Sequence, residues 1–123
     1  MIDFKNSSFV KLRKTDNSNA DVVSKLLIHG EETIGCYQGI RDSVIFTNKR
    51  IISVNIQGMT GMKKVFTSMP YSKIQMFSVE TAGALDFDSV LEVSFNDIGQ
   101  IRFEFTGACD IQCIGQLIAS YTL

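Results

Sequence analysis

The stretch SVLEVSFNDIGQIRFEF, residues Ser89 to Phe105, contains two runs in which apolar and polar side chains alternate. A period of two is typical of a strand with one face against a core and the other in water. A strand covered on both faces would be apolar along its whole length. The intervening residues, NDIG, are typical of a turn between two strands. The stretch therefore predicts two neighbouring strands of an antiparallel sheet.

The same period of two extends over most of the chain after Gly30. Further strands are expected at 32–38, 43–47, 51–56, 65–69 and 74–81, which with the first two make seven. Near the C-terminus, apolar residues three and four apart predict a helix over 107–121. Residues 1–30 form an extension in which SNADVVSKLLIHG predicts a short helix. We expect one mainly β domain, a barrel or sandwich over 31–105 capped by the last helix.

The composition excludes several functional classes. Twelve basic and thirteen acidic residues in a chain of 123 leave a formal charge of −1, so no overall attraction to nucleic acid is expected. The start, MIDFKNSSFVKLRK, does not resemble a secretory signal, and no apolar run approaches the roughly 18 residues of a membrane helix. Three cysteines favour reduced thiols over a disulfide framework. We expect a cytoplasmic protein.

The turn within FTNKRIISVNI, residues 46–56, is compatible with two registers. A two-residue loop places Phe46 opposite Ile51 and mixes apolar and polar residues on the inward face. A three-residue loop, 48–50, gathers the inward apolar residues on one face: Val44, Phe46, Ile52, Val54 and Ile56. We prefer the three-residue loop, which requires a positive φ at Arg50 or at a neighbouring residue.

In the preferred register Ile45 and Ile51 point outward, on a face that should be wet. Phe77 and Val79, or the alternate face of the same strand, supply further outward apolar side chains. A second copy of the chain would cover such a surface, although single exposed isoleucines are also common on monomers. The candidate oligomer interface is therefore Ile45, Ile51, Phe77 and Val79.

Two dibasic pairs are candidate contacts for an anion or a lipid. One lies at the hairpin turn, and the other follows the segment QGMTGM, whose methionines could enter a membrane interface. Solvated turn charges and a mobile loop are the simpler interpretation. The segment lacks the spacing of a nucleotide-binding phosphate loop. The candidates for anion or lipid contact are Lys49, Arg50, Lys63, Lys64, Met59 and Met62.

Metal and catalytic motifs are weak. The cysteines and the single histidine match no recognised zinc spacing: His29, Cys36, Cys109 and Cys113. Asp86 and Asp88 lack the repeated oxygen ligands of a calcium loop. No nucleophile lies in a recognised motif near the histidine. We expect no catalysis, no metal and no cofactor.

The runs VIFTNKRIISVNIQG and FTSMPYSKIQMFSVETAG, followed by the strand pair and the amphipathic helix, resemble the bacterial pleckstrin-homology-like (PH-like) domain family, in particular its small stand-alone members. The resemblance implies a seven-stranded, strongly bent antiparallel barrel capped by a C-terminal helix. It also implies a non-enzymatic interaction module that self-assembles into ring-like homo-oligomers. The lipid-binding motif of eukaryotic relatives falls at 38–42, where only Arg41 is basic, so lipid binding is not carried over from the family. Peripheral membrane binding through the loop lysines and methionines remains the alternative.

Overall fold

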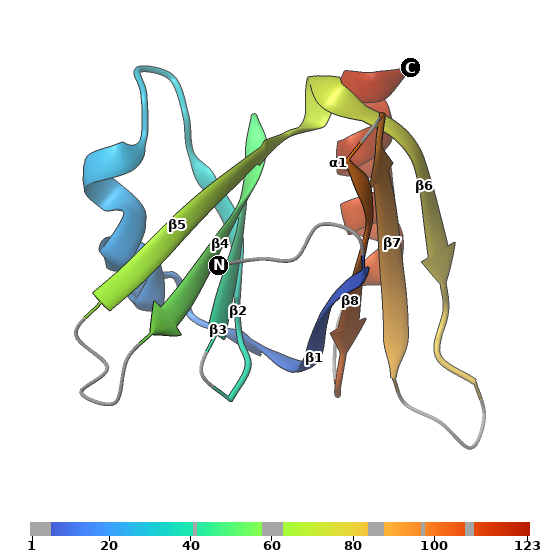
Figure 1. Ribbon diagram of the computed structural model, residues 1–123, viewed down its shortest axis with the longest axis horizontal. Helices are drawn as coiled ribbons and strands as arrows, with labels where there is room; N and C mark the ends of the chain where they lie inside the picture. Colours follow the sequence, from blue (N-terminus) through green and yellow to red (C-terminus); the bar gives the residue numbers. More distant parts are fainter. Residues whose placement is uncertain (1–5, 41, 58–62, 84–87, 97, 108–109) are drawn as a thin grey trace.

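The computed structural model describes residues 6–40, 42–57, 63–83, 88–96, 98–107 and 110–123. Its strands form one sheet in the order β5-β4-β3-β2-β1-β8-β7-β6, which curls into a half-barrel (Figure 1). The strands are β1 (Asn6–Thr15), β2 (Thr33–Gln38), β3 (Asp42–Thr47), β4 (Arg50–Gln57), β5 (Lys63–Pro70), β6 (Ile74–Glu80), β7 (Ser89–Phe95) and β8 (Gly99–Phe105). The helices are two 3₁₀ segments, η1 (Asn17–Leu26) and η2 (Tyr71–Lys73), and α1 (Ile111–Thr122). The mainly β fold with a C-terminal helix is confirmed, with eight strands instead of seven.

The additional strand is β1, which the sequence pattern did not predict. It pairs in parallel with β8 and then antiparallel with β2, and so joins the two halves of the sheet. Phe9 pairs with Phe103 and Leu12 pairs with Phe105, so β1 holds one residue more than β8 between these pairs. Such a bulge breaks the period of two. The core residues Phe9 and Leu12 are therefore three apart, which concealed the strand.

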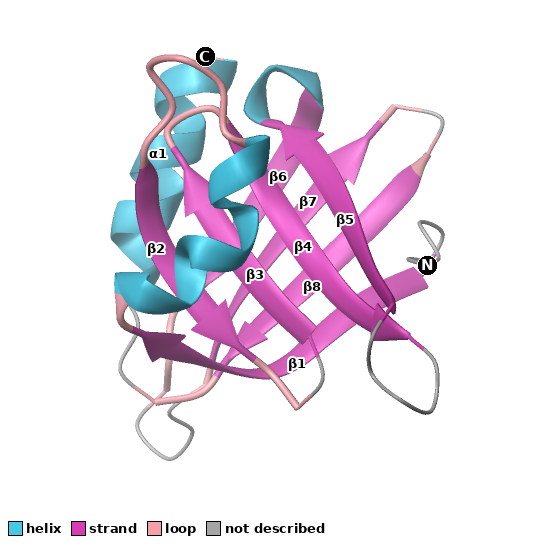
Figure 2. Cartoon of the chain, turned by 90° about the vertical axis from the view of Figure 1, so that its left-hand side faces the viewer, coloured by secondary structure: helices cyan, strands magenta, loops and turns pink. Residues whose placement is uncertain are grey.

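The helix expected near the N-terminus is present as the 3₁₀ helix η1. It lies across the outer face of the β2 to β4 half of the sheet (Figure 2). A second apolar cluster fills the space beneath it: Val23, Cys36, Ile45, Ile52 and Val54, with Val22 and Leu27 packed at its margin. This half of the sheet is consequently buried on both faces.

The turn between β3 and β4 adopts the register that we had not preferred. Phe46 pairs with Ile51 and Val44 with Ser53, and Lys11 is the one described non-glycine residue with a positive φ. The prediction of a three-residue loop was therefore wrong. It assumed that one face of this hairpin is wet, whereas η1 covers that face. The hairpin can therefore bury apolar side chains on both of its faces. Ser53, which pairs with Val44, is fully buried as well.

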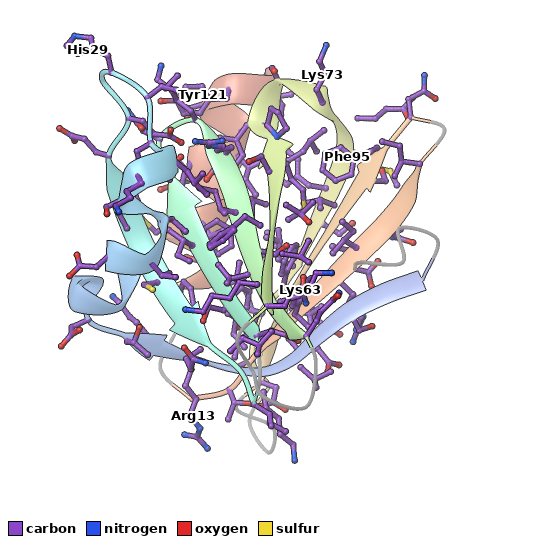
Figure 3. All side chains as sticks on the ribbon, turned by 60° about the vertical axis from the view of Figure 1, so that its left-hand side comes forward. Arg13, His29, Lys63, Lys73, Phe95 and Tyr121 are labelled. Carbon is purple, nitrogen blue, oxygen red and sulfur yellow. The ribbon has the colours of Figure 1, made fainter. Side chains whose placement is uncertain are left out.

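Helix α1 closes one end of the curled sheet, as predicted, although it begins at Ile111. Asp110 precedes it, and its carboxylate accepts a hydrogen bond from the Cys113 backbone N–H at 3.1 Å, which satisfies one free N–H of the first turn. The side chains of Ile114 and Ile118, on the inward face of α1, belong to the main core. Figure 3 shows the side chains that fill the curled sheet, with Arg13 at the end opposite His29 and Tyr121.

Candidate functional site

The predicted interface isoleucines are not at the surface. Ile51 belongs to the main core and Ile45 to the cluster beneath η1, and both are 0% exposed. The expectation that they point outward was wrong, for the same reason as the register. Phe77 and Val79 are half-buried and pack against the main core. The alternate face of β6 carries Met76, which is 59% exposed.

The edges of the sheet are the surfaces that this topology leaves open for contact. Strands β5 and β6 are the first and last in the sheet order, so each has one side that is not paired within the sheet. In β5 Met69 is buried, while Phe66 on the same strand is exposed. Figure 1 shows β5 and β6 lying apart, joined through η2. Each edge presents a row of backbone N–H and C=O groups without a strand partner.

Proteins usually protect such edges with lysine, proline or charge. Strand β5 has these residues at its two ends, where Lys63 and Lys64 begin it and Pro70 finishes it. The five residues 65–69 between them carry no charge. Strand β6, with the sequence IQMFSVE, has one charged residue, at its end. The middle of each edge therefore lacks these protecting residues.

Arg50 was predicted as an anion contact, but its guanidinium forms hydrogen bonds with other residues of the chain. Its Nε atom lies 2.9 Å from a carboxylate oxygen of Glu31, and its Nη2 donates to the Leu26 carbonyl at 2.7 Å. Its Nη1 donates to Ser68 Oγ at 2.8 Å. Arg50 thereby ties the end of η1 to strands β4 and β5. Lys49 beside it is exposed, so the pair does not act as one anion site.

The carboxylate of Glu31 is the centre of these interactions, which we call the clasp between Arg50 and Glu31. Burial alone would raise the pKa of Glu31, but hydrogen bonds from Arg50, from the Thr47 hydroxyl at 2.7 Å and from the Ile28 N–H at 3.1 Å lower it overall. Glu31 is therefore ionised. Tyr71 supports the same hairpin by donating its hydroxyl to the Thr47 carbonyl at 2.7 Å, and burial raises the pKa of Tyr71 far above its usual range.

Sequence reasoning missed this clasp because Glu31 and Arg50 are 19 positions apart and neither lies in a recognisable motif. An acidic residue after a predicted helix and a basic residue at a turn are common on solvated surfaces. Their pairing depends on the position of η1 over the sheet. No local pattern in the sequence could have indicated it.

The remaining candidates do not converge on one site. Lys63 and Lys64 are exposed at the start of β5, whereas Met59 and Met62 lie outside the described residues, as do Cys109 and Asp86. Cys36 is buried and Cys113 is exposed. Across the part of the chain that the structure describes, no three His, Cys, Asp or Glu side chains are grouped as metal ligands would be. None of the described helices has the length and apolar run needed to cross a bilayer.

Known structures and sequences resemble this chain over much of its length. A crystal structure of a protein with a pleckstrin-homology domain from Shewanella loihica superposes with a TM-score of 0.78 at 31% identity, covering 93% of this chain and 99% of that one. A pleckstrin homology domain from Shewanella amazonensis gives a TM-score of 0.63 at 35% identity, covering 87% of each chain. A PH-domain protein from Exiguobacterium sibiricum shares the fold, with a TM-score of 0.58 at 19% identity, and the match covers 90% of this chain and 58% of that one.

Two proteins of Bacillus subtilis (strain 168) are similar in sequence. The uncharacterized protein YjqA is 45% identical over 71 residues, which is 58% of this chain and 57% of YjqA. The uncharacterized protein YozO is 36% identical over 75 residues, which is 61% of this chain and 65% of YozO. The matched part of this chain thus spans less than two thirds of either relative. The family model described as the bacterial PH domain matches residues 3–122, and the chain therefore belongs to the bacterial PH domain family.

Proposed function

We propose that this chain is a non-enzymatic interaction module that assembles into a homo-oligomer through the two edges of its sheet. The observation that supports the proposal is the pair of open edges, β5 and β6, at the two ends of one eight-stranded sheet. In this proposal the two edges replace Ile45 and Ile51 as the contact surface, because both isoleucines are buried.

Pairing between two different edges gives a head-to-tail contact. If β5 of one copy pairs with β6 of the next, the same two surfaces are used at every contact, and the assembly closes into a ring when the rotation permits. Pairing of β6 with β6 would instead stop at a dimer. Backbone hydrogen bonds across the contact satisfy the groups that the edges leave open. Phe66 and Met76, which are 36% and 59% exposed, add apolar area at the two edges.

The mass of the purified protein in solution, measured by light scattering after gel filtration, tests the proposal. We expect a multimer at micromolar concentration that persists at high salt, because backbone pairing and apolar contact are weakly screened. Phe66→Lys and Met76→Lys should each reduce the mass to that of a monomer, since an edge lysine disfavours strand pairing.

Ile34→Lys is the matched control, because Ile34 is 48% exposed but lies on β2, in the interior of the sheet order. It should assemble as the wild type does. Circular dichroism melts show whether each variant is folded. A monomeric wild type, or edge variants that assemble unchanged, would contradict the proposal.

Membrane contact through the dibasic pairs is the alternative function. Its support is weaker than the sequence suggested, because Arg50 is held by Glu31. Lys49, Lys63 and Lys64 remain exposed and able to contact an anionic surface. Cosedimentation with anionic vesicles tests this alternative. The wild type should bind the vesicles, and the double variant Lys63→Gln with Lys64→Gln should not.

A further inference from the structure

We propose that η1 is a strap that lifts from the sheet while the strands stay folded, and that it keeps a second apolar face of the sheet covered. The inference concerns the outer face of β2 to β5 and does not depend on assembly through the edges. Lifting η1 also uncovers the thiol of Cys36, which therefore reports the open state.

The face beneath η1 is a continuous apolar surface. The cluster that η1 covers consists of buried side chains from three strands: Cys36, Ile45, Ile52 and Val54. Phe66 pairs with Val54 and is 36% exposed, and side chains directly opposite on neighbouring strands share a face. Phe66 therefore extends the cluster onto β5. With η1 lifted, the apolar surface crosses four neighbouring strands, and exposed surfaces of this kind are where proteins contact one another.

The helix η1 is held by few packing contacts of its own. Among its described side chains, 21–26, Val23 is the one that is buried, while Leu26 is 41% exposed. It is a 3₁₀ helix of ten residues, and 3₁₀ runs longer than about three or four residues are uncommon because their hydrogen bonds have poorer geometry. A segment with little burial and little intrinsic stability opens more readily than the fold as a whole.

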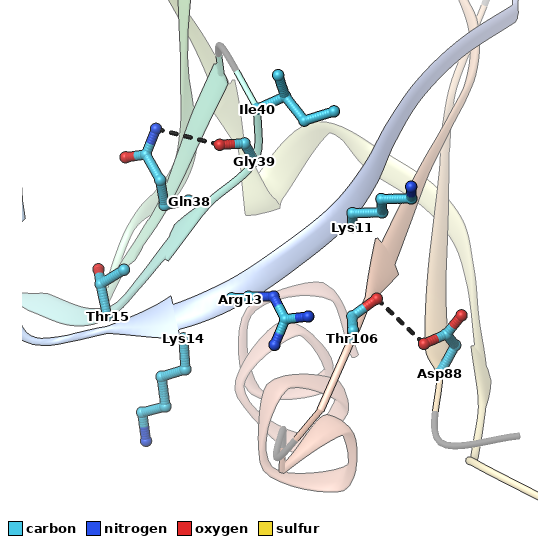
Figure 4. A pocket seen from close by; sticks show the side chains of 9 residues that line it. All are labelled: Lys11, Arg13, Lys14, Thr15, Gln38, Gly39, Ile40, Asp88 and Thr106. Carbon is cyan, nitrogen blue, oxygen red and sulfur yellow. Dashed lines mark hydrogen bonds between the residues drawn. The ribbon is translucent and has the colours of Figure 1, made fainter.

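The clasp between Arg50 and Glu31 fastens η1 at its C-terminal end. Arg50 donates a hydrogen bond to the Leu26 carbonyl at 2.7 Å while Glu31 holds its guanidinium. Before η1 begins, Thr15, which Figure 4 shows at the end of β1, donates its hydroxyl to the Cys36 carbonyl at 3.3 Å. This bond holds β1 to β2 and does not involve η1. The pairing of these two strands therefore does not depend on the strap.

The strands beneath η1 also have a support on their other face. Strands β2 to β5 pair with their neighbours through their backbones, and their inward side chains, including Tyr37, Phe46 and Ile51, belong to the main core. Lifting η1 removes the cover from one face and leaves the other face packed. We therefore expect the sheet to remain folded in the open state.

The thiol of Cys36 measures this opening. Cys36 is 1% exposed, so an aromatic disulfide reagent, dithiobis(nitrobenzoate), can reach it only when its cover lifts. The Cys36 thiolate attacks the disulfide of the reagent, forms a mixed disulfide and releases a nitrothiobenzoate ion, whose absorbance gives the rate. The protein for this measurement carries Cys109→Ser and Cys113→Ser, which remove the other two thiols of the chain.

Val23→Ala and Val93→Ala form a matched pair of variants. Both valines are 0% exposed, but Val23 lies on η1, whereas Val93 lies on β7 in the main core. Val23→Ala should speed the labelling of Cys36 about tenfold, because it removes two buried methyl groups from the strap. Val93→Ala weakens the fold elsewhere and should leave the rate unchanged. Arg50→Met should speed labelling about 100-fold, because it breaks the clasp.

The dependence of the wild-type labelling rate on urea is the second measurement. It should be weak, because lifting a strap exposes little surface, whereas global unfolding depends steeply on urea. The proposal is overturned if Val93→Ala speeds labelling as much as Val23→Ala, or if the wild-type rate follows global unfolding in urea. Met76→Lys, at the β6 edge, should be labelled at the wild-type rate. A monomeric wild type with the expected labelling would contradict assembly alone.

Discussion

The clasp between Arg50 and Glu31 predicts a large loss of stability when the arginine is removed. We consider Arg50→Met, which retains an apolar stem and removes the guanidinium. The Glu31 side chain is 0% exposed, and Arg50 supplies two of its hydrogen bonds, at 2.9 and 3.0 Å. The variant leaves a buried carboxylate with only the Thr47 hydroxyl and the Ile28 N–H as partners.

Breaking a buried ion pair by removing one partner costs about 3–5 kcal/mol. The Arg50 side chain is 19% exposed, so water can partly replace it, and we expect about 3 kcal/mol, the lower end of that range. The whole domain should be stable by about 6–18 kcal/mol, so this loss is a substantial fraction. The melting temperature should fall by about 10 °C.

Urea unfolding followed by circular dichroism measures the loss, and Arg102→Met is the matched control. Arg102 pairs with Glu92 across the sheet surface, where the two side chains are 39% and 30% exposed. Such an exposed pair is screened by water, so its loss should change the free energy of unfolding much less than the loss of the buried pair. Equal losses for the two arginine variants would refute the reasoning, because burial is what should separate them.

The clasp also predicts how stability depends on pH. The folded-state pKa of Glu31 lies below its ordinary value of 4.5, so its contribution is fully present above pH 4.5. It is lost as the pH falls through the folded-state value. Glu31→Gln should lack this part of the acid dependence, so the stability difference between wild type and variant should narrow toward low pH. A difference that stays constant down to pH 3 would contradict the assignment.

Two further predictions concern burial. Tyr71→Phe removes the hydrogen bond to the Thr47 carbonyl and should lower the free energy of unfolding in urea by about 1–1.5 kcal/mol. Because burial raises the pKa of Tyr71, alkaline titrations of the wild type and of this variant, followed by tyrosine absorbance, should show no ionisation of Tyr71 until the protein unfolds. A phenol signal near pH 10 that is absent from the variant would contradict the burial of its hydroxyl. Ile45→Ala should destabilise the fold by about 2–4 kcal/mol, because Ile45 is fully buried beneath η1. If Ile45→Ala instead changed the oligomer mass with no loss of stability, the burial assignment would be incorrect.

Much of the fold could be predicted because most strands follow simple periodicity. In β7 and β8 the inward residues, such as Leu91 and Phe103, occupy every second position, and the structure buries them as expected. The helix after Asp110 could be recognised by its apolar face. The first strand could not, since its bulge places Phe9 and Leu12 three residues apart. Periodicity reveals strands whose ladders are regular.

The predictions of the hairpin register and of the oligomer interface were wrong for a different reason. Whether Ile45 faces solvent depends on what covers the sheet, and alternation within the hairpin does not contain that information. The covering element, η1, comes from a distant part of the sequence. The pairing of Glu31 with Arg50 was hidden in the same way, because the two residues are 19 positions apart in the sequence. Sites assembled from distant segments require the three-dimensional arrangement.

The position of β1 between β2 and β8 sets the order in which the chain can fold during synthesis. Strands β2 to β5 are consecutive and pair with their sequence neighbours, so this half can form as soon as it leaves the ribosome. Strand β1, however, pairs Phe9 with Phe103, which is synthesised much later. Until β8 emerges, one part of β1 has no partner, and joining the two halves requires closing the long loop between Phe9 and Phe103. The sheet can therefore be completed only after β8 has left the ribosome, although the half formed by β2 to β5 can form earlier.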